Sequence, residues 1–182
     1  MINKEALEKV FEKHGITDYK WVCPATDVFV EQWVRFRCYY GCNGFGKSGT
    51  CPPTVPSVAE CREAVMCYQH GILIHDVVTY EDAESYSAKL VDITKRHMAA
   101  EKDVFLEGCY KALLFTCDGC HTCKECTADG CREKCVNGLH ARPGMDAMSI
   151  DVYKTARKAG YDVNVLKNNT QPTDRFALLL ID

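Results

Sequence analysis

Residues 111–135, KALLFTCDGCHTCKECTADGCREKC, pass from a short apolar run into a segment that has no apolar periodicity. The first six residues predict a buried strand, and the loss of periodicity over residues 117–140 predicts a loop. Six of the thirteen cysteines of the chain fall within this loop. The stretch therefore indicates an ordered core that carries a Cys-rich loop subdomain over about residues 117–143.

Regular structure is expected on both sides of this loop. Ser57 and Glu60 have the spacing of a capping box, and Gly71 is expected to end the helix that begins there. Further helices are expected at residues 2–14, at 82–107 and from 142 to near 160, and strands at 33–38, 72–80, 111–116, 161–166 and 175–181. This order predicts a single α/β or α+β domain over residues 1–182, with a small mixed sheet, flanking helices and the Cys-rich metal-binding loop subdomain.

The composition is that of an ordinary globular protein. Of the 182 residues, 47% are hydrophobic and 26% are charged, a balance that excludes wholesale disorder. The net charge of -3 provides no basic surface for nucleic acid. No apolar run is long enough to span a membrane, and the first residues lack the apolar core of a signal peptide. We therefore expect a cytoplasmic protein that binds neither nucleic acid nor membranes.

The thirteen cysteines are the exceptional feature. Disulfides rarely persist in a reducing cytoplasm, and an odd number of cysteines fits poorly with complete pairing. Four cysteines lie among apolar or helical residues and are expected to pack as small hydrophobic side chains, namely Cys23, Cys61, Cys67 and Cys109. The other nine form two sets, and the spacing within each set indicates metal binding.

The larger set has the spacing of an iron–sulfur loop. Cys120, Cys123 and Cys126 are each separated by two residues, as in the ferredoxin-type loops that hold a [4Fe–4S] cluster. Two intervening residues let successive thiolates reach neighbouring corners of the cube. The fourth ligand usually comes from further along the chain, and here Cys135 or Cys131 is available.

Zinc is the alternative for this set. Cys117-x2-Cys120 together with Cys131-x3-Cys135 would make a closed site of four thiolates. A zinc site needs only two such pairs, whereas the sequence has three evenly spaced C-x2-C steps. The spacing therefore favours the iron–sulfur cluster and leaves zinc as the second interpretation.

The smaller set consists of Cys38, Cys42 and Cys51, followed by the pair Pro52-Pro53. Cys38 is expected at the end of a strand, and the other two thiols in a Gly-rich loop. Three thiols without a local fourth ligand leave two possibilities for a metal site: a distant residue completes it, or one metal corner stays open. The plain alternative is that these are ordinary loop and strand cysteines.

The sequence of the same loop also fits the consensus pattern of a phosphate-binding loop. Residues 41–48 fit the pattern G-x4-G-K-[ST]. A phosphate site also needs a helix directly afterwards, because the amides at the helix N-terminus bind the phosphate. Residues 49–53, GTCPP, cannot begin such a helix. The glycines are therefore interpreted as residues that give a metal-binding loop its backbone flexibility.

Two motifs together resemble a known family. Residues 37–53 carry R-C-x3-C-x3-G-K and C-P-P, and residues 120–135 carry C-x2-C-x2-C-x8-C, followed by ARPGMDA at 141–147 and IDV at 150–152. These motifs are similar to those of a group of predicted metal-binding proteins found in anaerobic bacteria and archaea. The resemblance spans most of the chain and implies an iron–sulfur or other metal protein. By this resemblance Cys135 is the fourth cysteine of its set, although residues 136–138, VNG, replace a proline that is usual there.

Three functions follow from these observations. The first is an iron–sulfur protein with one or two [4Fe–4S] clusters that transfers electrons to a redox partner protein. The second is an enzyme in which Cys38, Cys42 and Cys51 leave one iron open to a small substrate. The third is a zinc-stabilised interaction module. Arg142 either offsets the negative charge of a thiolate-bound cluster or has a structural role beside the loop. The oligomeric state is not indicated by the sequence.

Overall fold

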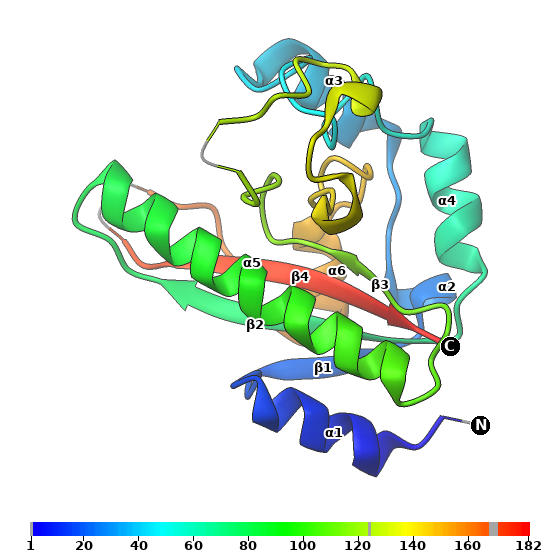
Figure 1. Cartoon of the computed structure of the whole chain (residues 1–182). Coiled ribbons are helices and arrows are strands. Elements are labelled where there is room, and N and C mark those ends of the chain that lie inside the picture. Colours follow the sequence, from blue (N-terminus) through cyan, green and yellow to red (C-terminus); the bar gives the residue numbers. More distant parts are fainter. Residues whose placement is uncertain (1, 124, 168–170) are drawn as a thin grey trace.

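The computed structural model describes residues 2–123, 125–167 and 171–182. Its centre is a sheet of four strands in the order β1-β2-β4-β3 (Figure 1). The strands are β1 (Tyr19–Val22), β2 (His70–Val78), β3 (Leu113–Phe115) and β4 (Thr173–Ile181). The mixed helix-and-strand class is confirmed. The expected mixed sheet is corrected, because every pairing between these described strands is antiparallel.

One face of the sheet is covered by α1 (Lys4–Lys13) and α5 (Ala83–Leu106) (Figure 1). Strand residues alternate between the two faces, so Leu179 of β4 packs toward these helices whereas Leu178 and Leu180 pack away from them. From the helices, Phe11 and Val104 are fully buried against this face. The predicted helical periodicities of both segments are therefore confirmed.

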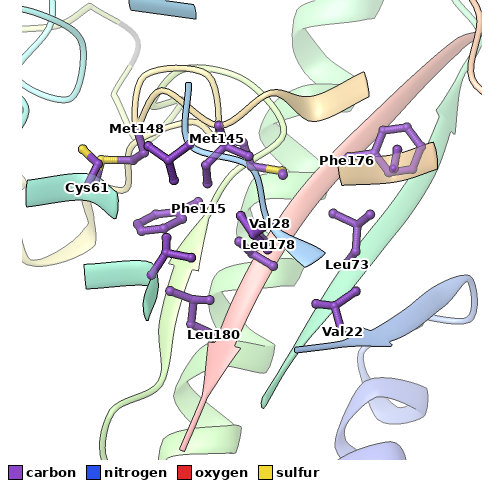
Figure 2. Packing of buried hydrophobic residues seen from close by; sticks show 14 of the residues in the cluster. Val22, Val28, Cys61, Leu73, Phe115, Met145, Met148, Phe176, Leu178 and Leu180 are labelled. Atoms are coloured by element: carbon purple, nitrogen blue, oxygen red, sulfur yellow. The ribbon is translucent and has the colours of Figure 1, made fainter. Parts of the chain in front are cut away.

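The opposite face is covered by α2 (Pro24–Asp27), α4 (Val58–Met66), α6 (Val152–Lys158) and the segment 144–150. Figure 2 shows Met145 and Met148 of that segment close to Phe115 of β3. The remaining helix, α3 (Gln32–Gly41), lies at one end of the molecule. There it is accompanied by the Cys-rich loop with its short turns η1 (Arg132–Lys134) and η2 (Gly138–His140) (Figure 1).

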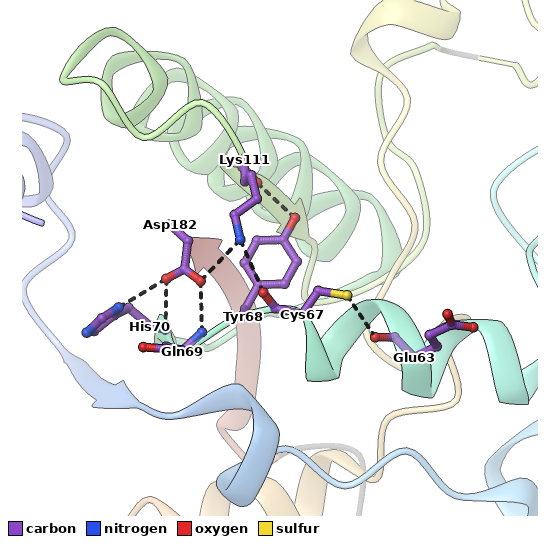
Figure 3. A network of polar contacts seen from close by, with 7 residues as sticks. All are labelled: Glu63, Cys67, Tyr68, Gln69, His70, Lys111 and Asp182. Carbon is purple, nitrogen blue, oxygen red and sulfur yellow. Dashed lines mark hydrogen bonds and ion pairs between the residues drawn. The ribbon is translucent and has the colours of Figure 1, made fainter. Parts of the chain in front are cut away.

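A polar network holds the opposite end of the sheet together (Figure 3). The Asp182 carboxylate, directly after β4, accepts hydrogen bonds from the backbone amides of Gln69 and His70 at 2.9 and 3.1 Å. It also accepts a bond from Lys111, at 3.4 Å from Nζ. The residue after the last strand therefore joins the start of β2 to the segment that leads into β3.

Several expectations about helices and strands are wrong, among them the helix from residue 142, because α6 begins only at Val152. Residues 33–38 form part of α3 and not a strand, because their aromatic side chains are exposed and have no sheet to pack on. Residues 161–166 form no strand, since the Arg157 side chain of α6 donates a hydrogen bond to the Val163 carbonyl at 2.9 Å, which a strand partner would otherwise use. Gly71 lies inside β2, where a Cβ would stand 3.0 Å from the Leu179 carbonyl oxygen, and α4 ends at Met66.

The sequence expectations also missed β1 and α2, which are each only four residues long. Cys61 and Cys109 are buried, as predicted. Cys67 is exposed, which contradicts the prediction, because it follows the last turn of α4 and hydrogen-bonds the Glu63 carbonyl at 3.3 Å (Figure 3). Among the described helices, none combines the length and apolar character that a bilayer span requires.

The His75 side chain gives the fold a predictable pH dependence. Its Nδ1 and Nε2 lie 2.6 Å from Asp18 and 2.9 Å from Asp174, so two carboxylates face one imidazole. Burial lowers the pKa of His75, but the hydrogen bonds to both carboxylates outweigh it and raise the pKa above the ordinary 6.5. The protonated ring therefore stabilises the folded state below the ordinary pKa, and this contribution is lost as the pH rises through the raised value.

We expect the free energy of unfolding to fall by less than about 1 kcal/mol across this pH range, because both carboxylates are partly solvated. Urea unfolding of the wild type and of His75→Gln at several pH values measures the effect. The stability advantage of the wild type over the variant should shrink as the pH rises. An advantage that stays constant with pH would contradict this interpretation.

Candidate metal centre

The spacing of Cys38 and Cys42 is explained by α3. Cys38 lies in its last turn and Cys42 directly follows its last residue, so the two side chains are one helical turn apart. The expectation that Cys38 ends a strand is therefore wrong, and C-x3-C is a helical spacing. The Cys42 sulfur accepts a hydrogen bond from the Gly44 amide at 3.4 Å. This contact turns the following loop back over the helix end.

Cys51 joins these two thiols from the far side of the loop. Burial raises the pKa of Cys51 to about 11, and the charges of Asp146, Cys42 and Cys38 contribute to the increase. Burial also raises the pKa of Cys38, again with contributions from Asp146 and Cys42. The structure therefore brings the three predicted thiols and the Asp146 carboxylate close enough to interact electrostatically.

The thiols of the larger set are surrounded by hydrogen-bond donors. The Thr122 hydroxyl lies 3.1 Å from the sulfur of Cys120 and 3.8 Å from that of Cys123. The backbone amide of Ala128 is the main cause that lowers the pKa of Cys126, Gly49 lowers it further, and partial burial acts in the opposite direction. Donors directed at sulfur stabilise a thiolate, which is the form that binds metal.

The two candidates for the fourth ligand differ in their surroundings. The Cys131 thiol donates to the Glu133 carboxylate at 3.0 Å. Cys135 is held in place from both sides, because the Thr127 hydroxyl donates to the Lys134 carbonyl at 3.1 Å and accepts from the Val136 amide at 3.4 Å. Since Thr127 directly follows Cys126, these bonds place the backbone around Cys135 beside Cys126.

Cys117 is partly buried at the edge of the core and lines the same cavity as Cys38 and Cys42. Its thiol packs against the layer formed by α1 and α5, and burial raises its pKa to about 12. A thiol in such surroundings resists the deprotonation that metal binding needs. Burial raises the pKa of Cys51 in the same way, so this property does not separate the zinc arrangement, which pairs Cys117 with Cys120, from the iron–sulfur arrangement.

The two Cys loops touch one another through glycines. Gly130, at φ +69°, approaches Gly46 so closely that a Cβ at position 130 would lie 2.3 Å from the Gly46 carbonyl oxygen. Ser48 and Gly49 of the first loop also lower the pKa of Cys126 in the second, so these groups lie close to one another. The two thiol sets are therefore carried by loops that pack against each other.

Gly130→Ala is expected to separate the two loops. The substitution combines left-handed backbone strain with a steric overlap, and we expect it to cost about 1–3 kcal/mol. Gly46→Ala is the matched control, because Gly46 also has a positive φ of +73° but no atom within 4 Å of its Cβ position. Limited proteolysis measures the effect, and the loops should be cleaved faster in Gly130→Ala than in the control. Equal cleavage of both variants would contradict the loop contact.

Arg142 connects the C-terminal end of the Cys-rich loop to the core through hydrogen bonds and an ion pair. Its Nε lies 2.9 Å from both carboxylate oxygens of Glu101, a buried residue of α5. Glu101 also accepts from the Leu114 amide of β3 at 2.9 Å, and Arg142 donates to the Leu139 carbonyl at 3.0 Å. Of the two roles considered for Arg142, these contacts favour the structural one.

A cavity of about 430 Å³ opens beside the smaller thiol set. Cys38 and Cys42 line it together with Asp146, and apolar side chains such as Trp33 and Phe176 complete its walls. Asp146 is accessible because it faces this cavity. Protein nevertheless surrounds it closely enough that burial raises the pKa of its carboxyl group. The sequence analysis did not single out Asp146, although it stands within the ARPGMDA motif.

A family model for predicted metal-binding proteins, designated DUF2284, matches residues 21–181. The chain belongs to this family. The match covers both Cys loops and confirms the resemblance drawn from the sequence motifs, and with it a metal-binding role. No curated protein and no solved structure matches the chain. Within residues 2–123, 125–167 and 171–182, no group of three or more His, Cys, Asp or Glu side chains is arranged to hold a single metal ion.

Proposed function

We propose that this family member is an iron–sulfur protein that holds one or two [4Fe–4S] clusters and transfers electrons to a partner protein. Cys120, Cys123, Cys126 and Cys135 would hold one cluster, and Cys38, Cys42 and Cys51 would hold part of a second. The donor set is suitable, because thiolates are the ligands of such clusters. A cluster of several irons also holds its thiolates further apart than a single ion does.

The observation that carries this proposal is the junction between the two loops. The Gly130–Gly46 contact brings the two backbones together, and Ser48 and Gly49 of one loop lower the pKa of Cys126 in the other. Clusters on both loops would therefore be neighbours at one end of the molecule. Short separation between centres and hydrogen bonds to sulfur are what an electron-transfer protein requires.

The same end of the molecule suits a protein partner. Exposed apolar side chains gather on α3 and on the Cys-rich loop, including Tyr39, Tyr40, Val136 and Leu139, the last of which is 88% exposed. Figure 1 shows these two segments at the same end. Exposed apolar surface of this kind is typical of a protein interaction site. All thirteen cysteines are free thiols, which suits a reducing compartment such as the cytoplasm.

Substitutions in each loop test the proposal. After anaerobic reconstitution, Cys42→Ser and Cys123→Ser should each lose about half of the bound iron if two clusters are present, and the double variant should lose all of it. Cys67→Ser is the matched control, because Cys67 is exposed and lies outside both loops. If Cys67→Ser lost as much iron as the loop variants, or if both loop variants kept the full amount, the proposal would be wrong.

A second candidate function is favoured by the cavity. Three thiols leave one iron of a cube without a cysteine ligand, and the cavity leads to two of these thiols. An enzyme could use that iron to bind a small substrate. A change in the visible or EPR spectrum on adding small ligands such as cyanide would support this candidate, whereas an unchanged spectrum would favour electron transfer alone.

A further inference from the structure

The His75 side chain is an ionisable group to which the proposed function gives no role. It extends from β2, and its ring nitrogens lie 2.6 Å from Asp18 and 2.9 Å from Asp174. Asp18 directly precedes β1 and Asp174 belongs to β4, so three segments of the sheet meet at this ring. The His75 amide also donates to the Asp18 carbonyl at 2.9 Å, which fixes the backbone beneath the ring.

This arrangement is fully hydrogen-bonded only when the ring is protonated. A neutral imidazole has one N–H group, so it donates to one carboxylate and directs a lone pair toward the other, whereas the imidazolium donates to both. Burial lowers the pKa of His75, and the bonds to the two carboxylates more than offset this effect. The two carboxylates therefore make the ring a specific binding place for one proton.

Aromatic side chains shield the ring. Phe176 stacks on it with the ring centroids 4.7 Å apart, and the Tyr161 ring lies at 4.9 Å. The Tyr161 hydroxyl donates to Asp18 at 2.9 Å, and the Lys20 ammonium lies 5.7 Å from the centroid of the Tyr161 ring. In the part of the chain that the structure describes, the charged and titratable groups that these contacts place around His75 are Asp18, Asp174, Tyr161 and Lys20.

A proton can nevertheless reach the ring from solvent. The His75 side chain is only 12% exposed, but the Asp18 side chain is 53% exposed and that of Asp174 is 37% exposed. Both carboxylates therefore connect the shielded ring to water.

The ring lies behind the wall of the cavity at the smaller thiol set. Asp174, which faces one ring nitrogen, and Phe176, which stacks on the ring, both line this cavity. Cys38 and Cys42 line the same cavity. Charges that face each other across a cleft with apolar walls are screened less than charges in bulk water. A charge on the His75 ring therefore acts on a cluster held by these thiols.

We propose that His75 is a proton-binding site whose occupancy is coupled to the oxidation state of a cluster held by Cys38, Cys42 and Cys51. This inference rests on the proposed function. A cluster that accepts one electron from a reductant gains one negative charge, and the neutral ring then takes one proton from water onto its free nitrogen. On oxidation, the electron and the proton both leave. The coupling is reciprocal, so protonation of the ring also favours reduction of the cluster.

Redox titration of the reconstituted protein at several pH values tests the inference. The visible absorption reports the ratio of reduced to oxidised cluster at each applied potential. At one applied potential, we expect this ratio to fall about two- to tenfold as the pH rises through the titration of His75, the effect of one charge across a cavity of this size. His75→Gln should remove this dependence. The same measurement on Cys123→Ser observes the cluster of the smaller set alone.

His70→Gln is the matched control. His70 also pairs with a carboxylate, that of Asp182 at 3.0 Å, but it lies at the opposite end of the sheet (Figure 3). This variant should keep the pH dependence of the wild type. If His75→Gln does not fold, Asp174→Asn decides the outcome, because the ring then binds its proton less tightly and the dependence should move to lower pH.

The inference would be overturned if the wild-type ratio did not change with pH, if His75→Gln kept the dependence, or if His70→Gln lost it. A dependence that stayed at the same pH in Asp174→Asn would also overturn it. A Cys123→Ser protein without iron would overturn the inference and leave the proposed function intact, with its cluster on the larger set. The failure of the proposed function looks different, because the reconstituted wild type would then contain neither iron nor sulfide.

Discussion

Replacement of Arg142 by alanine is expected to lower the free energy of unfolding by about 3–5 kcal/mol. The substitution leaves the Glu101 carboxylate without its guanidinium partner, and the Glu101 side chain is only 7% exposed. A buried charge without a partner is costly because protein replaces its hydration shell. The variant also loses the bond from Arg142 to the Leu139 carbonyl, which holds the end of the Cys-rich loop.

Chemical denaturation of Arg142→Ala and of the double variant Glu101→Gln, Arg142→Ala measures this effect. The double variant should recover part of the stability, since glutamine still accepts from the Leu114 amide without a buried charge. The control is Lys154→Ala, whose pair with Glu31 is largely exposed and is expected to contribute no more than about 1 kcal/mol. Equal losses in Arg142→Ala and Lys154→Ala would contradict the structural role of Arg142.

Phe115→Ala is expected to destabilise the protein by about 3–5 kcal/mol, the range for a fully buried phenylalanine. Phe115 is 1% exposed and lies beside Met145 and Met148, directly before the Cys-rich loop (Figure 2). The void left by the missing ring would also loosen the segment 144–150, whose methionines pack on Phe115.

Phe36→Ala is the matched control for Phe115→Ala. Phe36 is an aromatic residue of α3 with 56% of its surface exposed, and its removal should change stability by no more than about 0.5 kcal/mol. Thermal or urea unfolding of both variants gives the comparison. A small loss for Phe115→Ala would mean that this layer of the core is not packed as described.

The parts of the fold that the sequence predicted are those that depend on local periodicity. Strands β2 and β4 each contain an apolar run, ILI at residues 72–74 and FALLLI at residues 176–181, and α5 carries both a helical pattern and a capping box at Asp82. Helix α3 was misread because Trp33, Phe36 and Tyr39 favour strands by composition. These side chains instead remain exposed on the helix.

The candidate site was predictable to the same extent. The spacing of the cysteines identified both thiol sets, because ligand spacing is a local property of the chain. The effect of Ser48 and Gly49 on the pKa of Cys126, and that of Asp146 on the pKa values of Cys38 and Cys51, depend on how distant loops pack. Such contacts leave no local pattern in a single sequence, and only the structure brings them together.

The central claim is that thiols from two loops hold iron–sulfur clusters, and the most direct test is to measure iron and acid-labile sulfide after anaerobic reconstitution of the whole chain. We expect equal amounts of iron and sulfide, about four of each per chain for one cluster or about eight for two. The visible absorption should bleach in oxygen. Zinc bound without sulfide, or iron bound without sulfide, would contradict the claim.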